Sequence, residues 1–305
     1  MQAPNTKQLT ARRIAAAVSA LLAVAAIDAQ ASTVSLGSYA GLFQGVSEIT
    51  ANVDGHTAAV VRVDLSAPGI SFTTTAPCAG CTANSGSGNE VVKQKTGDYM
   101  VSVGAQVAIN ANRYANNDNQ PTATAFSGLG VSNGTLTSSD ESGFAALLIS
   151  STNQASIVPG GSASSLNGVQ NAIAGTQGTI LTNGVNNAIS DNQSANRAGL
   201  GLSEDGQYMY LMDVSGVSLG EESDLFSALG AWDAINLNGG SSAMLDVANG
   251  SGGVTMLNHT TEKYVSPNLA IFAAPLTPVP LPPALVLFGS GLLGMLGFNR
   301  RRVAA

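Results

Sequence analysis

Short runs of apolar residues, separated by turn residues, fill residues 32–275. In the segment 57–65, Val61, Val63 and Leu65 fall on one face, which is the alternation of a half-buried strand. Further strands are predicted at 70–75, 107–109, 200–202, 208–214 and 235–237. Many short strands with few helices predict one α+β domain with a mostly antiparallel or mixed sheet.

Turn and cap residues locate hairpins and helices. Asn133-Gly134 and Asn183-Gly184 suit tight hairpin turns, because both residue types tolerate positive φ. Ser218 and Glu221 have the spacing of a capping box, so a helix is predicted over 219–229. A second helix is expected to begin within 90–96.

Composition and charge argue against a disordered chain and against a nucleic-acid-binding protein. The chain has 305 residues, 44% hydrophobic and 10% charged, which excludes a largely disordered chain. Half of its 12 basic residues lie near the two ends, so residues 32–275 hold six basic and eighteen acidic residues, a net charge of −12. Such a body repels nucleic acid, and no nucleic-acid partner is expected.

The first 31 residues have the order of a secretory signal. Lys7, Arg12 and Arg13 precede an apolar stretch from Ile14 to Ile27, and Ala29-Gln30-Ala31 offers a cleavage site. Signal peptidase would therefore release a chain that begins at Ser32.

The segment 276–305 also has the order of a processing signal. A Val-Pro-Leu-Pro-Pro stretch at 279–283 precedes an apolar run at 284–298 and three arginines at 300–302. This arrangement resembles a PEP-CTERM sorting signal in its V-P-L-P variant, which an exosortase recognises. The alternative is a plain membrane anchor. Either interpretation places a transmembrane segment here, and the resemblance implies an exported protein of a bacterial surface or exopolysaccharide matrix.

Cys78 and Cys81 are the two cysteines of the chain. The C-x-x-C spacing allows a redox pair, half a zinc site or a local disulfide. Only two histidines, His56 and His259, are present to complete a zinc site. In an oxidising compartment we expect a disulfide. Both histidines lie among loop residues, so they are expected at the surface.

The segment from Asn236 to Ser242 carries the candidate chemistry. Gly239 and Gly240 let backbone N–H groups approach an anion, and Ser241 adds a hydroxyl donor. An ordinary glycine-rich turn is the alternative. The signatures of serine hydrolases, zinc proteases and nucleotide-binding loops are absent.

Residues 229–242 resemble the L-G-A-x-x-A-x-N-L-D-G-G-x-S-S signature of the phosphodiester glycosidase family. Further segments resemble other motifs of the family, and they follow one another along the chain in the family's order. These segments are 107–112, 171–175 with 180–184, 197–201 and 262–269. The resemblance covers about residues 60–272 and implies hydrolysis of a sugar-1-phosphodiester.

Site roles follow from the resemblance. Catalytic roles fall on Arg197, whose planar guanidinium suits phosphate, and on Asn238. The remaining residues are assigned to substrate binding, and they are Asn110, Asn112, Gly239, Gly240, Ser241, Ser242, Lys263 and Asn268.

The sequence departs from the family at three places, one of which is a pair of residues. Asn238 replaces an aspartate, and an amide cannot exchange protons at neutral pH. Lys263 replaces an arginine, and Arg113-Tyr114 stands where two aromatic residues are usual.

The sequence therefore predicts an exported hydrolase that acts on a sugar phosphodiester. The alternative is a non-catalytic glycan-binding or matrix protein of the same descent, because of Asn238. No cofactor and no metal ligands are predicted, although a divalent cation at the site is left open. The expected partners are a sugar phosphate or glycan, signal peptidase, exosortase and, through the C-terminal segment, the membrane.

Overall fold

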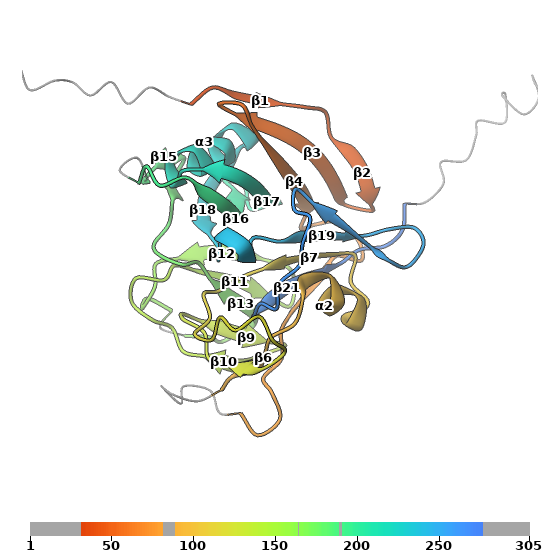
Figure 1. Ribbon diagram of the computed structural model, residues 1–305, viewed down its shortest axis with the longest axis vertical. Helices are drawn as coiled ribbons and strands as arrows, with labels where there is room; N and C mark the ends of the chain where they lie inside the picture. The colour runs from red at the N-terminus through yellow and green to blue at the C-terminus, as the bar shows by residue number, and fades with distance from the viewer. Residues whose placement is uncertain (1–31, 82–88, 164, 189–190, 277–305) are drawn as a thin grey trace, which may run out of the picture. The chain divides into compact units, whose positions relative to one another are not determined.

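The structure is a computed structural model (Figure 1). It describes residues 32–81, 89–163, 165–188 and 191–276. The described residues from Thr33 onward belong to one compact unit. The expected signal peptide (1–31) and nearly all of the expected sorting signal (276–305) lie outside the described residues. Within the described residues, no helix is both long and apolar enough to cross a membrane.

The largest sheet has nine strands, all paired antiparallel, and is called here the nine-stranded sheet. Its members are β1 (Val34–Leu36), β2 (Ala40–Phe43), β3 (Val46–Val53), β4 (His56–Asp64), β14 (Leu181–Thr182), β15 (Val185–Asn186), β16 (Ala195–Ser203), β17 (Tyr208–Val217) and β18 (Ala231–Asn236). The order is β1-β3-β4-β17-β16-β18-β14-β15, and β2 pairs with β3.

Two five-stranded antiparallel sheets and one short pair complete the strands of the described residues. The β7 sheet has the order β20-β19-β7-β21-β5 and consists of β5 (Ser71–Thr74), β7 (Val107–Asn110), β19 (Leu245–Ala248), β20 (Val254–Leu257) and β21 (Asn268–Phe272). The β13 sheet has the order β10-β9-β13-β11-β12 and consists of β9 (Gly130–Ser132), β10 (Thr135–Ser138), β11 (Ala146–Ser150), β12 (Ala155–Val158) and β13 (Val169–Ala174). The short pair is β6 (Val91–Val92) with β8 (Ala123–Thr124).

The predicted hairpins are confirmed. Asn133 and Gly134 join β9 to β10 with φ values of 47° and 78°. Asn183 and Gly184 join β14 to β15 with φ values of 51° and 73°. The α+β class and the mostly antiparallel pairing are confirmed as well.

Two α-helices lie within the described residues. α3 (Leu219–Leu229) begins at the predicted capping box, in which the Ser218 side chain accepts from the backbone of Glu221 and the Glu221 side chain accepts from the backbone of Ser218. The helix expected to begin within 90–96 does so only at the last residue of that segment. Val91–Val92 form β6, and α2 (Thr96–Val103) begins only at Thr96. The β-branched pair fits an extended strand better than a first helical turn.

The main core lies between the three larger sheets. It contains apolar side chains from every one of them, for example Val61 from β4, Ile109 from β7 and Leu147 from β11. The opposite face of the nine-stranded sheet packs against α3 (Figure 1). Gly199 of β16 allows this contact, because a Cβ there would lie 2.7 Å from the Phe226 ring. The central strands β16, β17 and β18 of this sheet therefore have buried side chains on both faces, and their ends position the site.

Candidate functional site

The glycine–serine loop, residues 238–242, follows β18 and contains the short 3-10 helix η1 (Gly240–Ser242). Gly239 lies so close to β16 that a Cβ there would be 2.6 Å from the carbonyl oxygen of Asn196. Gly240 has a φ of +63°, in the left-handed region that glycine tolerates best. Both glycines are therefore required by the backbone path of the loop.

Asn110, at the end of β7, holds both ends of this loop. Its Nδ2 donates to the carbonyl oxygen of Asn238 at 2.5 Å, and its Oδ1 accepts from the backbone N–H of Met244 at 2.9 Å. The backbone N–H of Asn238 donates in turn to the carbonyl oxygen of Ala111 at 2.8 Å. Asn110 is 1% exposed, so its side chain holds the loop through these two hydrogen bonds from the protein interior.

Asn112 and Asn268 are buried in the same way. The Nδ2 of Asn112 donates to the carbonyl oxygens of Ser127 and Leu129, and its Oδ1 accepts from the backbone N–H of Ala174. Asn268 lies opposite Asn110 in the β7–β21 pair, and its Oδ1 accepts from the Thr96 hydroxyl at 2.8 Å. These bonds connect strands and loops, and binding of substrate by either amide stays a prediction.

Lys263 and Ser241 meet at the exposed surface of the glycine–serine loop. The Nζ of Lys263 donates to the Ser241 hydroxyl at 3.2 Å and to the Asn117 side chain. In the described part of the chain Lys263 forms no ion pair. Ser242 is buried and its hydroxyl is 3.2 Å from that of Tyr114. A half-buried cation thus lies against a hydroxyl of the loop, as binding of an anion requires.

Arg197 is close to the loop through its backbone, since a Cβ on Gly239 would lie 3.8 Å from the Cα of Arg197. Its guanidinium is bound elsewhere. Nε donates to the carbonyl oxygen of Val217 at 3.2 Å and Nη2 to that of Gln193 at 2.6 Å. The catalytic role of Arg197 therefore stays a prediction, because these two hydrogen bonds use only two of the five N–H donors of the guanidinium.

His259 is not a surface histidine, and this expectation is wrong. Its side chain is 10% exposed and lies between Asp213 of β17 and Asp246 of β19. Nδ1 is 3.1 Å from an oxygen of Asp213, and Nε2 is 3.3 Å from an oxygen of Asp246. The two aspartates are 1% and 0% exposed. This cluster, called here the Asp–His–Asp cluster, links the nine-stranded sheet to the β7 sheet.

Both ring nitrogens of His259 face carboxylate oxygens, which is the environment of a protonated imidazole. Burial lowers the pKa of His259, but the hydrogen bond to Asp213 and the nearby carboxylate of Asp246 outweigh it and raise the pKa to about 10. Burial raises the pKa of Asp213 and of Asp246, because it disfavours their charged forms. His259 is therefore a cation at neutral pH, held between two buried carboxyl groups.

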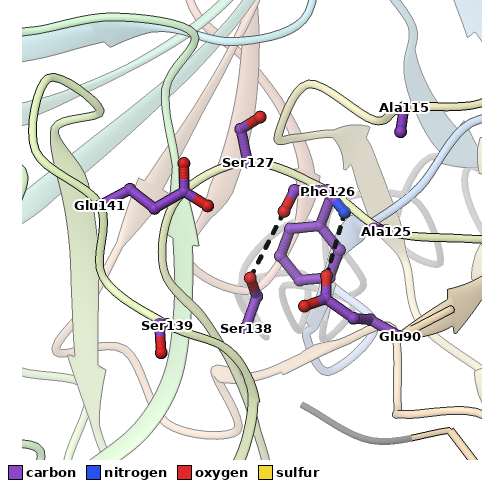
Figure 2. Close-up of a pocket in the computed structure, with 8 residues that line it drawn as sticks. All are labelled: Glu90, Ala115, Ala125, Phe126, Ser127, Ser138, Ser139 and Glu141. Atoms are coloured by element: carbon purple, nitrogen blue, oxygen red, sulfur yellow. Dashed lines mark hydrogen bonds between the residues drawn. The ribbon is translucent and has the colours of Figure 1, made fainter. Parts of the chain in front are cut away.

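A separate cavity of about 350 Å³ lies beside Phe126 (Figure 2). Glu90 accepts from the backbone N–H of Phe126 at 3.0 Å, and the Ser138 hydroxyl donates to the carbonyl oxygen of Phe126 at 3.4 Å. Glu141 lines it as well, and no basic residue does. The carboxyl groups on its wall carry negative charge, which disfavours a phosphodiester here.

Within the described residues, no group of three or more His, Cys, Asp or Glu side chains could hold a metal ion. In the Asp–His–Asp cluster each ring nitrogen of His259 faces a carboxylate oxygen, at 3.1 Å and 3.3 Å. Cys78 and Cys81 form a disulfide with their Cα atoms 5.2 Å apart, within the usual range of disulfide geometry.

Comparison with known proteins gives a family and a fold. The family model for phosphodiester glycosidase matches residues 103–272, more than half of the chain. No curated protein matches this chain.

The solved structures that match include three with TM-scores just above 0.5. The catalytic domain of zebrafish N-acetylglucosamine-1-phosphodiester alpha-N-acetylglucosaminidase, auto-inhibited by its pro-peptide, matches with a TM-score of 0.52 and 16% identity over 81% of this chain and 85% of that one. A protein of Burkholderia pseudomallei, named as exported, matches with a TM-score of 0.55 and 11% identity over 80% and 97%. A hypothetical protein of Synechocystis matches with a TM-score of 0.51 and 14% identity over 80% and 68%. These likenesses establish the shared fold.

Proposed function

The chain belongs to the phosphodiester glycosidase family, and from that premise we propose that it hydrolyses a sugar-1-phosphodiester at the glycine–serine loop. The contact between Lys263 and Ser241 carries the proposal, because it places a cation at the loop in a body of strong negative charge. A phosphodiester is an anion, and this cation attracts it locally.

The loop offers further donors for the phosphate oxygens. Among the hydrogen bonds of the described residues, the backbone N–H groups of Gly239, Gly240 and Ser241 donate to no protein acceptor. Together with the Ser241 hydroxyl and the Lys263 ammonium, these groups can surround an oxyanion and stabilise charge that develops during hydrolysis.

Hydrolysis also needs a proton to reach the leaving oxygen or to leave the attacking water. Asn238 cannot supply it, and this observation favours the second candidate function, glycan binding without turnover. The two functions differ in one measurable property, because both retain a bound glycan and only the first releases free sugar.

The test is release of sugar from an α-linked sugar-1-phosphodiester by the purified protein. We expect Lys263→Ala to lower kcat/KM by about a hundredfold, the order of magnitude for loss of one transition-state donor. Arg62→Ala is the matched control, because Arg62 lies over the rings of Tyr39 and Tyr208, away from the loop contacts. Equal activity in Lys263→Ala and wild type would contradict the assignment of the phosphate to this loop.

Asn238→Asp separates the two functions. If Asn238→Asp releases sugar and the wild-type protein does not, the native protein binds the glycan without hydrolysing it. Release by both proteins would show a hydrolase that does not need the aspartate of the family. Release by neither, with glycan retained on both, would support the binding protein.

We also propose that the protein is exported and processed at its C-terminus by an exosortase. The Cys78–Cys81 disulfide supports an oxidising compartment, and the residue order of 1–31 and 278–302 supports the two signals. Deletion of 278–302 should change the size and the cell fraction of the exported protein. An unchanged product would contradict processing at this segment.

A further inference from the structure

A polar cavity of about 200 Å³ opens beside the glycine–serine loop. Gly240 and Ser241 form part of its wall, and Asp213 and His259 of the Asp–His–Asp cluster also line it. The nine-stranded sheet and the loop after β20 therefore both contribute to the cavity, and the loop that carries the proposed phosphate site borders it.

The lining consists mainly of hydroxyl and amide side chains. They are Asn196, Ser215, Ser241, Asn258, Thr260 and Thr261. Such groups both donate and accept hydrogen bonds, as recognition of a polyhydroxylated ring requires. The cavity is smaller than the ~300–1,000 Å³ of sites for drug-sized ligands, so it suits a single ring.

Charge divides the surroundings of Ser241 into two parts. On one side the Ser241 hydroxyl meets the ammonium of Lys263, which is not part of the cavity wall. Asp213 and the imidazole of His259 line the cavity, while Asp246 contacts the imidazole from β19 without lining the cavity, so the charge of this imidazole is already matched by two carboxyl groups. A phosphate is attracted to the first part and not to the second, whereas a neutral sugar hydroxyl is a good donor to the Asp213 carboxylate.

We propose that this cavity binds the sugar ring of the substrate, with Ser241 at the junction between the ring and the phosphate. This inference rests on the proposed function and assigns the second half of the same substrate. Asp213 at the base of the cavity accepts from ring hydroxyls, while Asn196 and Thr260 exchange hydrogen bonds with hydroxyls nearer the opening.

His259 is a positioning residue in this arrangement. Its Nδ1 donates to Asp213 Oδ2, and the Asn258 side chain donates to the Asp213 carbonyl oxygen at 3.1 Å. Asp246 fixes the other edge of the imidazole from β19. The Asp213 carboxylate therefore has a set direction before any ring arrives, which reduces the entropy cost of binding.

Saturation-transfer NMR on the full chain tests the proposal, with the methyl α-glycosides of glucose, mannose and N-acetylglucosamine as probes. We expect transfer to the ring protons of at least one glycoside. Asn196→Ala and Thr260→Val should each weaken its affinity roughly fivefold, as loss of one hydrogen bond does. Both positions are exposed, so the fold tolerates these changes. Ser139→Ala, in the cavity of Figure 2, is the matched control and should bind as wild type does.

The outcomes separate this inference from the proposed function. Ring binding that Asn196→Ala and Thr260→Val weaken supports the cavity, even if no variant hydrolyses a phosphodiester. Hydrolysis with no transfer to any glycoside, or with equal affinity in both variants and the control, overturns the cavity and leaves the hydrolase intact. Lys263→Ala should keep glycoside binding, and its loss there would also contradict the division at Ser241.

Discussion

Alkaline pH should lower the free energy of unfolding of the protein, because the Asp–His–Asp cluster loses a proton. The pKa of His259 is 6.5 in an ordinary environment and about 10 in the folded protein. Between these values the folded state holds a proton that the unfolded state has released, so the free energy of unfolding falls as pH rises. The stabilisation by His259 is complete below pH 6.5 and is lost as pH rises through 10.

The magnitude follows from the same pKa change. At about 1.4 kcal/mol per tenfold change in proton affinity, the upper limit is about 5 kcal/mol. Removal of one partner from a buried ion pair costs about 3 to 5 kcal/mol in other proteins. We therefore expect His259→Gln to destabilise the protein by about 3 kcal/mol at pH 6 and by little at pH 10.5.

Urea unfolding at pH 6, 8 and 10.5 measures this effect as the difference between wild type and His259→Gln. The difference cancels the titration of lysines and tyrosines that both proteins share. His56→Gln is the control, because His56 is exposed and forms no ion pair with a carboxylate within the described residues. A difference that is constant over this pH range would refute the assignment of a raised pKa to His259.

Two further changes test the glycine–serine loop. Gly239→Ala should destabilise the protein by about 2 kcal/mol, because the new Cβ would lie 2.6 Å from the carbonyl oxygen of Asn196; thermal unfolding measures the loss, and an unchanged Tm would contradict the close approach. Asn110→Ala leaves one backbone C=O and one backbone N–H without a partner and should cost about 2 kcal/mol in urea unfolding. The exposed Asn192→Ala is its control, and equal stability of the two variants would refute the bracing role.

Local sequence signals predicted those elements whose cause is local. The Asn-Gly pairs at 133 and 183 set their turns through backbone conformation, and Ser218 with Glu221 began α3 through two hydrogen bonds within one helical turn. The segment 90–96 lacks such a signal at its start. Its strand β6 depends on pairing with β8, about 30 residues further along the chain, which no local pattern reveals.

The Asp–His–Asp cluster had a signal that sequence reasoning did not use. Asp213 interrupts the apolar run of β17, and Asp246 interrupts that of β19. A carboxyl group within a buried strand needs a partner, and the chain has only 12 basic residues and two histidines to provide it. Which base meets which acid depends on how the two sheets pack, and this is a property of the tertiary fold.

The family motif predicted the path of the loop better than its chemistry, because the loop is held through backbone atoms of Asn238. Asn238 contributes its backbone N–H to Ala111 and its carbonyl oxygen to Asn110. Its side chain makes no hydrogen bond within the described residues, so the path of the loop does not depend on whether this position is an amide or a carboxylate. Asn238→Asp should therefore change the proton chemistry of the site without moving the loop. A change in sugar release can then be assigned to the carboxylate itself, provided that urea unfolding shows the two proteins to be equally stable.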